Sequence, residues 1–145
     1  MPGPARTVPA GLKEVVVKTD GAARGNPGPA ASAAVVFDQD GAVLLERAVL
    51  LGESTNNEAE YRGLILGLDL ARELGASRVI VKMDSQLVVR QMKGEYRIRK
   101  VHLEKLADIA KNKASVFESV IFQHIPRAEN KDADRVANAA LDNAD

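Results

Sequence analysis

This chain of 145 residues begins with short runs of apolar residues. In the segments that follow, the apolar residues recur at the spacing of a helix. The early runs are rich in valine, leucine and alanine, and glycine, proline or aspartate bounds each of them, as is typical of strands separated by turns. The expected strands are Glu14–Thr19, Ala31–Asp38 and Ala42–Leu51. We expect Asp20-Gly21 to end the first strand in a turn, and Asp40-Gly41 to form a tight hairpin between the other two.

The hydrophobic period changes to that of a helix at Thr55. In "TNNE", Thr55 and Glu58 match a capping box, in which a hydroxyl and a carboxylate satisfy free amides at a helix start. We expect this helix to reach Leu74 before Gly75 stops it. The later expected elements are a strand at Arg78–Met83, helices at Ser85–Met92 and Val101–Lys113, a strand at Val116–Ile125 and a helix at about Asn130–Leu141.

This order of elements predicts an α/β fold. Three consecutive strands followed by alternating helices and strands indicate a five-stranded mixed sheet with helices on both faces. The sheet should be antiparallel at one edge and parallel through its first, fourth and fifth strands. Because 145 residues suffice for one domain with a single core, we expect a flexible tail at residues 1–12 and one domain at residues 13–142.

The composition excludes several classes of protein. Apolar residues are 46% and charged residues 28%, as in soluble globular proteins, and no apolar run approaches the ~18 residues of a membrane span. The absence of cysteine excludes disulfides and thiolate metal sites. A formal net charge of zero attracts no nucleic acid by itself, so such a partner requires a local patch or metal ions. We expect a cytoplasmic monomer with no membrane partner.

Acidic residues occur where ligands gather in α/β sheets. Asp20 and Asp84 follow the first and fourth expected strands, whose carboxyl ends meet at one edge of the sheet. Glu60 shares its helical direction with Leu64 and Ala71, so it faces the sheet, where an unpartnered charge is costly. A basic side chain or a metal ion must therefore neutralise it. Oxygen ligands without cysteine suit Mg²⁺ or Mn²⁺ better than zinc.

Each of these candidates also has a simpler explanation. Taken alone, Asp20 is favoured as a turn residue that accepts backbone amides, and Asp84 as the cap of the helix that follows it. The last helix offers Asp132 and Asp134 on opposite flanks, and periodicity does not choose between them. His124, at the end of a strand, fits a structural imidazole at least as well as a functional one.

Four segments of the chain, taken in order, resemble the signature blocks of type 1 ribonuclease H: "TDGAARGNPGPA", "STNNEAEYRGL", "MDSQLV" and "HIPRAENKDADRVAN". They cover nearly the whole chain, from about Glu14 to Leu141. The resemblance implies the ribonuclease H-like fold and an endonuclease that hydrolyses the RNA strand of RNA/DNA hybrids, leaving 5′-phosphate and 3′-hydroxyl ends. It also implies two-metal-ion catalysis with Mg²⁺, for which Mn²⁺ can substitute.

The resemblance further implies which residues form the site. The implied catalytic residues are Asp20, Glu60, Asp84, Asp134 and His124, of which the four carboxylates are the metal ligands. The block "ENKDAD" thereby selects Asp134 over Asp132, and His124 matches a mobile histidine associated with proton movement or product release. The implied substrate contacts are Arg24, Asn26, Thr55, Asn56, Asn57 and Gln86. Short amides suit this role, because they can hydrogen-bond to the 2′-hydroxyl across a shallow minor groove.

One part of the family pattern is absent. Many relatives insert a basic protrusion with tryptophan after the "DSQ" helix, whereas here only "KGEYRIRK" (Lys93–Lys100) follows and the chain has no tryptophan. The chain therefore resembles the subgroup without the protrusion, and hybrid affinity would rest on this connector, a type of charged run that is ordinarily a solvated loop. Two alternatives stay open: a weak or inactive nucleic-acid-binding module of the same fold, and a phosphate- or nucleotide-binding α/β domain. Double-stranded RNA is left open as a second substrate.

Overall fold

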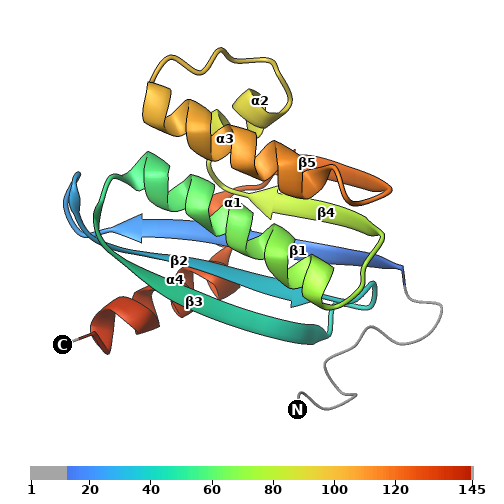
Figure 1. Cartoon of the computed structure of the whole chain (residues 1–145). Helices are drawn as coiled ribbons and strands as arrows, with labels where there is room; N and C mark the ends of the chain where they lie inside the picture. Colours follow the sequence, from blue (N-terminus) through green and yellow to red (C-terminus); the bar gives the residue numbers. More distant parts are fainter. Residues whose placement is uncertain (1–12, 145) are drawn as a thin grey trace.

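A five-stranded mixed sheet forms the centre of the protein (Figure 1). The computed structural model describes residues 13–144, and the tail expected at residues 1–12 lies outside them. The strand order is β3-β2-β1-β4-β5, with antiparallel pairing from β3 to β1 and parallel pairing from β1 to β5. The mixed sheet expected from the sequence is confirmed. The strands are β1 (Glu14–Ala23), β2 (Gly28–Phe37), β3 (Val43–Ser54), β4 (Arg78–Met83) and β5 (Ser119–His124).

The first strand is longer than expected, and the turn predicted at Asp20-Gly21 is wrong. β1 continues through Asp20, which pairs with Ala33, to Ala23. It can do so because β2 extends far enough to keep it paired, whereas the parallel partner β4 stops opposite Thr19. Asp20 therefore lies inside a strand, at the point where one of the two neighbouring strands has ended.

The fifth strand is shorter than expected, and its predicted start at Val116 is also wrong. β5 begins at Ser119, because the chain first closes a turn in which the amide of Phe117 donates to the carbonyl of Ala114. The Phe117 side chain is buried in the core next to this turn.

Four helices surround the sheet: α1 (Asn56–Glu73), α2 (Gln86–Met92), α3 (Val101–Ala114) and α4 (Lys131–Asp142). The predicted capping box of α1 is confirmed, because the Thr55 hydroxyl accepts from the amide of Glu58 at 3.2 Å and the Glu58 carboxylate accepts from the amide of Thr55 at 2.9 Å. As expected, α1 ends just before Gly75, whose φ is +80°. A short 3-10 turn at Arg127–Glu129 precedes α4.

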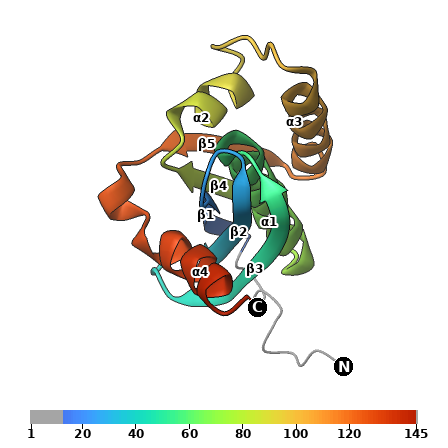
Figure 2. The same ribbon diagram turned by 90° about the vertical axis from the view of Figure 1, so that its left-hand side faces the viewer.

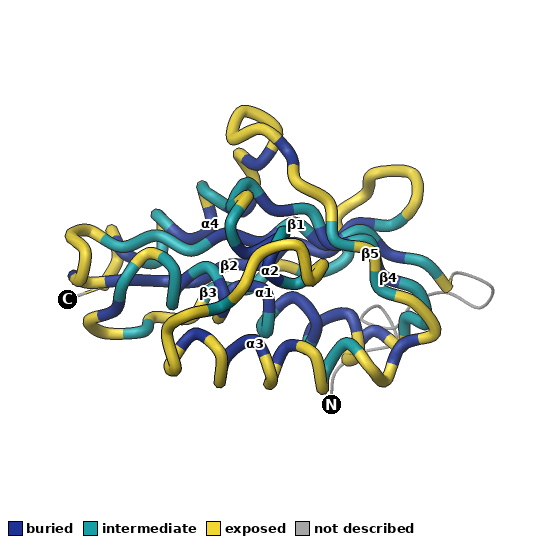
Figure 3. Tube along the Cα trace, turned by 90° about the horizontal axis from the view of Figure 1, so that it is seen from above, coloured by how far each residue is buried: buried dark blue, intermediate teal, exposed yellow. Residues whose placement is uncertain are grey.

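The helices lie on both faces of the sheet, as predicted. α1 and α3 enclose the larger core on one face, and α4 packs on β1, β2 and β3 from the other (Figure 2). Buried and exposed positions alternate along α3 (Figure 3), and its buried residues are those expected from the spacing: Leu103, Leu106, Ala107 and Ala110. Within residues 13–144, no helix combines the length and the apolar character that a membrane span requires.

Helix α1 crosses β1 at very short range. A methyl group on Gly21 would lie 2.2 Å from the carbonyl carbon of Ala59, and one on Gly63 would lie 2.7 Å from the carbonyl oxygen of Asp20. Since these neighbours are backbone atoms, they cannot rotate away from an added group. Glycine at these two positions therefore allows α1 to approach the strand that carries Asp20.

We predict that Gly63→Ala destabilises the protein, although alanine in a helix interior is ordinarily favoured over glycine by about 1 kcal/mol. Separating α1 from β1 should lower the free energy of unfolding by about 1–3 kcal/mol, which is typical of overpacking. Urea denaturation followed by circular dichroism measures this change. Gly41→Ala is the control: it adds a methyl group with no atom within 4 Å and tests the cost of a positive φ alone. A Gly63→Ala protein as stable as the parent would contradict the close approach.

Candidate active site

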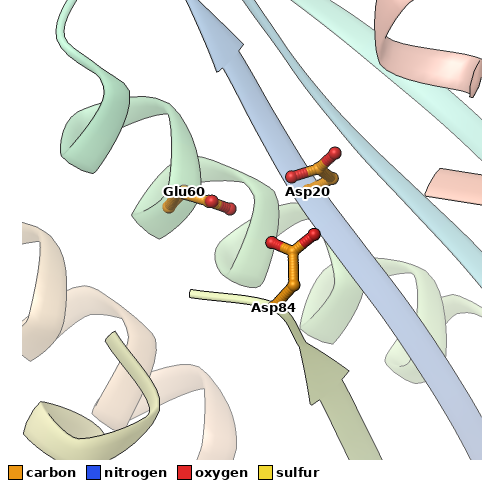
Figure 4. A group of neighbouring side chains, drawn as sticks. All are labelled: Asp20, Glu60 and Asp84. Carbon is orange, nitrogen blue, oxygen red and sulfur yellow. The ribbon is translucent and has the colours of Figure 1, made fainter. Parts of the chain in front are cut away.

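Three carboxylates from three different elements meet at one edge of the sheet. Asp20 comes from β1, Glu60 from α1, and Asp84 follows β4 directly; their side chains point toward one another (Figure 4). One oxygen from each lies within 4.8 Å of the others. The parallel register explains this meeting, because the last paired residues of β1 and β4 are Thr19 and Met83, and an aspartate follows each.

The simpler explanation of Asp84 as a helix cap is wrong. Ser85 caps α2 instead, since its hydroxyl accepts from the amide of Val88 at 3.3 Å. The carboxylate of Asp84 is therefore not used in capping and lies beside Asp20 and Glu60.

The simpler explanation of Asp20, as a turn residue that accepts backbone amides, accounts for only part of its contacts. Its carboxylate accepts from the amide of Gly21 at 3.0 Å, but the same amide also donates to Glu60 at 3.0 Å. One backbone N–H thus serves two carboxylates and holds them side by side.

A fourth acid, Asp134, lines the same pocket from α4. The pocket has a volume of about 430 Å³ and includes the three clustered acids. Asp132 lines a different pocket, beside Lys18 and Lys82. The buried side chain of Asn130, at the start of α4, donates to the carbonyl of Thr19 at 2.9 Å and fixes this helix against β1. The structure thus brings Asp134, and not Asp132, to the acid cluster.

The crowding of these acids changes their affinity for protons. Burial, together with the negative charges of Asp84 and Asp134, raises the pKa of Asp20 from 3.8 to about 7. Burial, with the charges of Asp20 and Asp84, raises the pKa of Glu60 well above its usual value. Within residues 13–144 no ion pair joins a basic side chain to any of the four acids. Clustered carboxylate oxygens without sulfur or histidine are the donor set of a hard divalent cation.

Arg127 is a pocket residue that the sequence reasoning missed. It lines the acid pocket from the 3-10 turn before α4, and its positive charge acts weakly against the rise in the pKa of Glu60. Its place in "HIPRAEN", between His124 and the last helix, was the available signal. Asn138 lines the same pocket and donates to the carboxylate of Asp134 at 3.1 Å.

His124 lies at the same edge of the sheet but outside the lining of the pocket. It is the exposed last residue of β5. In the parallel register it pairs with Met83, the residue that precedes Asp84. The structure therefore places His124 near the acid cluster without a direct contact to it.

Some of the expected substrate contacts line the pocket. Arg24 and Asn56 both do so. The guanidinium of Arg24 forms an ion pair with the carboxylate of Asp142 at 2.6 Å. Both side chains are exposed, and ion pairs of this kind contribute little to stability. Asn26 accepts from the amide of Asn56 at 3.1 Å, which links the β1–β2 turn to the start of α1.

The other expected contacts lie outside this pocket. Thr55 is used in the capping box, and Gln86 is exposed at the first position of α2. Asn57 lines a separate groove with the basic connector. The expected substrate contacts therefore fall into two groups. One lies at the acid pocket, and the other lies outside it.

Comparison with known proteins identifies the family. Residues 18–140 match the family described as reverse transcriptase-like. A solved structure of RNase H1 from the archaeon Halobacterium salinarum is 39% identical, with a TM-score of 0.89 over 90% of this chain and 99% of that one. This chain is a member of the type 1 ribonuclease H family. Like the subgroup without the basic protrusion, it has only residues 93–100 between α2 and α3.

Two further relatives of this ribonuclease H domain bear on its function. LC11-RNase H1, solved in complex with an RNA/DNA hybrid, is 43% identical, with a TM-score of 0.81 over 88% of this chain and 96% of that one. The bifunctional protein Rv2228c of Mycobacterium tuberculosis is 49% identical over 90% of this chain. The chain spans only 36% of the length of that mycobacterial protein.

We predict that the metal-free protein loses stability as the pH rises. The folded protein holds the Asp20 proton more tightly than the unfolded chain does, because the folded pKa is about 7 against 3.8. The contribution of Asp20 to the free energy of unfolding is therefore fully present below its unfolded pKa of 3.8, and it is lost as the pH rises to the folded pKa of about 7. Urea denaturation in EDTA across this range should show the decline, and Asp20→Asn should reduce it.

The matched control is Asp132→Asn, on the exposed side of α4, which should keep the decline of the parent. Mg²⁺ should raise the midpoint of unfolding more above the pKa of Asp20 than below it, because cation and proton compete for the same oxygens. Equal effects of Mg²⁺ at both pH values would contradict the assignment of the acids as a cation site.

Proposed function

We propose that this protein is an endoribonuclease that hydrolyses the RNA strand of RNA/DNA hybrids and leaves 5′-phosphate and 3′-hydroxyl ends. The observation that carries the proposal is the meeting of Asp20, Glu60 and Asp84, none of which forms an ion pair within residues 13–144. The chain is also 43% identical to an RNase H1 solved with a hybrid. Family membership alone would also allow an inactive binding module. Acids retained at all four expected positions favour the enzyme.

The four carboxylates would hold two divalent ions, with Mg²⁺ as the proposed metal and Mn²⁺ as a substitute. Such ions supply a water nucleophile at neutral pH and stabilise the charge of a phosphodiester under in-line attack. Asp20 shares the Gly21 amide with Glu60 and also interacts with Asp134, so it is the residue that could serve both ions. Arg127 would face the negative charge of the bound backbone.

The substrate residues are proposed from their places around the acids. Arg24 and Asn56 line the pocket, and Asn26 is hydrogen-bonded to Asn56. These three residues would orient the RNA strand, where amides can read the 2′-hydroxyl. Asn57 lies beyond it, in the groove of the basic connector, and Gln86 is exposed at the start of α2. Thr55 is proposed as a contact to a phosphate of the DNA strand, a role that competes with its capping box. The catalytic domain is proposed to be residues 13–142, acting as a cytoplasmic monomer.

We predict that Asp84→Asn nearly abolishes cleavage of the RNA strand of a labelled hybrid in Mg²⁺. The loss should reach about 100-fold or more, because residues one shell beyond a metal already cost 10- to 100-fold when changed. EDTA should abolish cleavage by the parent, and Mn²⁺ should restore it. Gel analysis of the labelled strand, with product ends mapped by phosphatase treatment, gives both the rate and the chemistry.

The control for folding is Asp69→Asn, which changes an acid paired with Lys113 far from the site along α1 and should cleave like the parent. Cleavage without metal, or no cleavage by a folded sample in either metal, is the result that overturns the proposed function. The same assay with an all-RNA duplex decides whether double-stranded RNA is also a substrate.

We predict that His124→Ala slows turnover without abolishing it. An exposed histidine at the same edge of the sheet as the acids would move a proton at the leaving or attacking oxygen, a contribution of about 100-fold in rate. The effect should fall on kcat, and the binding of metal should be unchanged when it is titrated by calorimetry. A His124→Ala protein with the parent's kcat across the pH range would exclude this role.

A further inference from the structure

The basic connector, residues 93–100, is held in place although it contains no helix or strand. The backbone amides of Glu95 and Tyr96 both donate to the carbonyl of Arg90, at 2.9 and 3.2 Å. The guanidinium of Arg90 donates to the Glu95 carboxylate at 3.1 Å and lies 5.3 Å from the centre of the Tyr96 ring. These contacts fix the first half of the connector to α2.

A buried polar chain reaches the second half of the connector. Tyr61, fully buried on α1, donates its hydroxyl to the side-chain oxygen of Gln91 at 2.6 Å. Gln91, itself buried on α2, donates through its side-chain nitrogen to the carbonyl of Arg97, in a long hydrogen bond of 3.5 Å. Since the Arg97 carbonyl can only accept, it sets the orientation of the Gln91 amide. The buried hydroxyl of Tyr61, whose pKa is raised to about 12, keeps its proton and remains a donor.

The connector held in this way presents a basic groove close to the acid pocket. Arg97, Arg99 and Lys100 line a groove of about 250 Å³ together with Asn57 of α1, and none of its lining residues in the described chain is acidic. Asn57 is adjacent in sequence to Asn56, which lines the acid pocket. The first turn of α1 therefore connects the two surfaces.

We propose that Gln91, held by Tyr61, is a positioning residue that sets the basic face of the connector relative to the acid pocket and thereby tunes affinity for the hybrid. Tyr61 is fully buried, and Gln91 is only 6% exposed where it forms part of the groove wall, so their effect would pass mainly through the connector that they hold. Phosphate contacts made by arginine and lysine supply much of the affinity for nucleic acid. This inference rests on the proposed function for its ligand, whereas the order of the connector can be measured without it.

The test compares Gln91→Leu, Tyr61→Phe and the double variant. Each single change leaves one buried polar partner unpaired, which costs stability, whereas replacing both partners by apolar groups can be nearly neutral. The double variant therefore separates loss of positioning from loss of folding. The readouts are KM and kcat on a labelled hybrid, hybrid binding at several salt concentrations, and hydrogen exchange of the amides at residues 95–100.

We expect all folded variants, including the double one, to raise KM about 5-fold while kcat changes less than about 2-fold, a pattern that marks lost binding rather than lost chemistry. The slope of log affinity against log salt should fall by about 1–2, as expected for one or two lost phosphate contacts. Exchange at residues 95–100 should be faster than in the parent. The control, Lys113→Ala, removes the surface ion pair with Asp69 and should change none of these values.

Two results would overturn the inference. One is a folded double variant with the KM, salt slope and connector exchange of the parent. The other is a fall in kcat at unchanged KM, which would show that the pair acts on the neighbouring Glu60 rather than on the connector. If the parent protein neither binds nor cleaves a hybrid, the proposed function fails, and the exchange data alone then decide whether Tyr61 and Gln91 position the connector.

Discussion

The short distance between α1 and β1 is the constraint on which the site depends. Glycine at positions 21 and 63 leaves the helix and strand backbones in contact, so that Glu60 of α1 reaches Asp20 of β1 across a single shared amide. A side chain at either glycine would separate the two elements and withdraw Glu60 from the cluster. Tyr61, the next residue along α1, contacts α2 through Gln91. Neighbouring residues of one helix therefore take part in the acid cluster and in the contact that holds the basic connector.

The acid cluster carries an energetic cost that the rest of the fold must offset. Three carboxylates lie within 4.8 Å of one another, with a fourth in the same pocket. Burial first, and then the repulsion between these acids, raises the pKa of Asp20 and of Glu60. A well-paired sheet and two cores hold the cluster in place. Divalent cations would convert the repulsion into binding energy at the position where a phosphodiester must be bound. A site that is costly when empty and favourable when loaded is the expected arrangement for metal-dependent phosphodiester hydrolysis.

The acid cluster and the basic connector lie on separate surfaces. Acids gather at the edge of the sheet, whereas the exposed cations of residues 93–100 gather on the connector beside Asn57, although the whole chain has a net charge of zero. Under the proposed function, a polyanionic substrate would be attracted at one surface and cleaved at the other. The connector is short, and Gln91 of α2, itself hydrogen-bonded to Tyr61 of α1, helps to hold its backbone in place.

The sequence by itself determined the features that depend on neighbouring residues. The capping box at Thr55, the stop at Gly75, the buried face of α3 and the order of strands and helices all follow from spacing within one or two turns. The four blocks that resemble ribonuclease H named the acids. Only the tertiary structure decided that β1 runs on past Asp20, that Glu60 and Asp20 share one amide, and that Arg127 enters the pocket. These features depend on which distant segments pair and how closely they approach, and local periodicity carries no information about either.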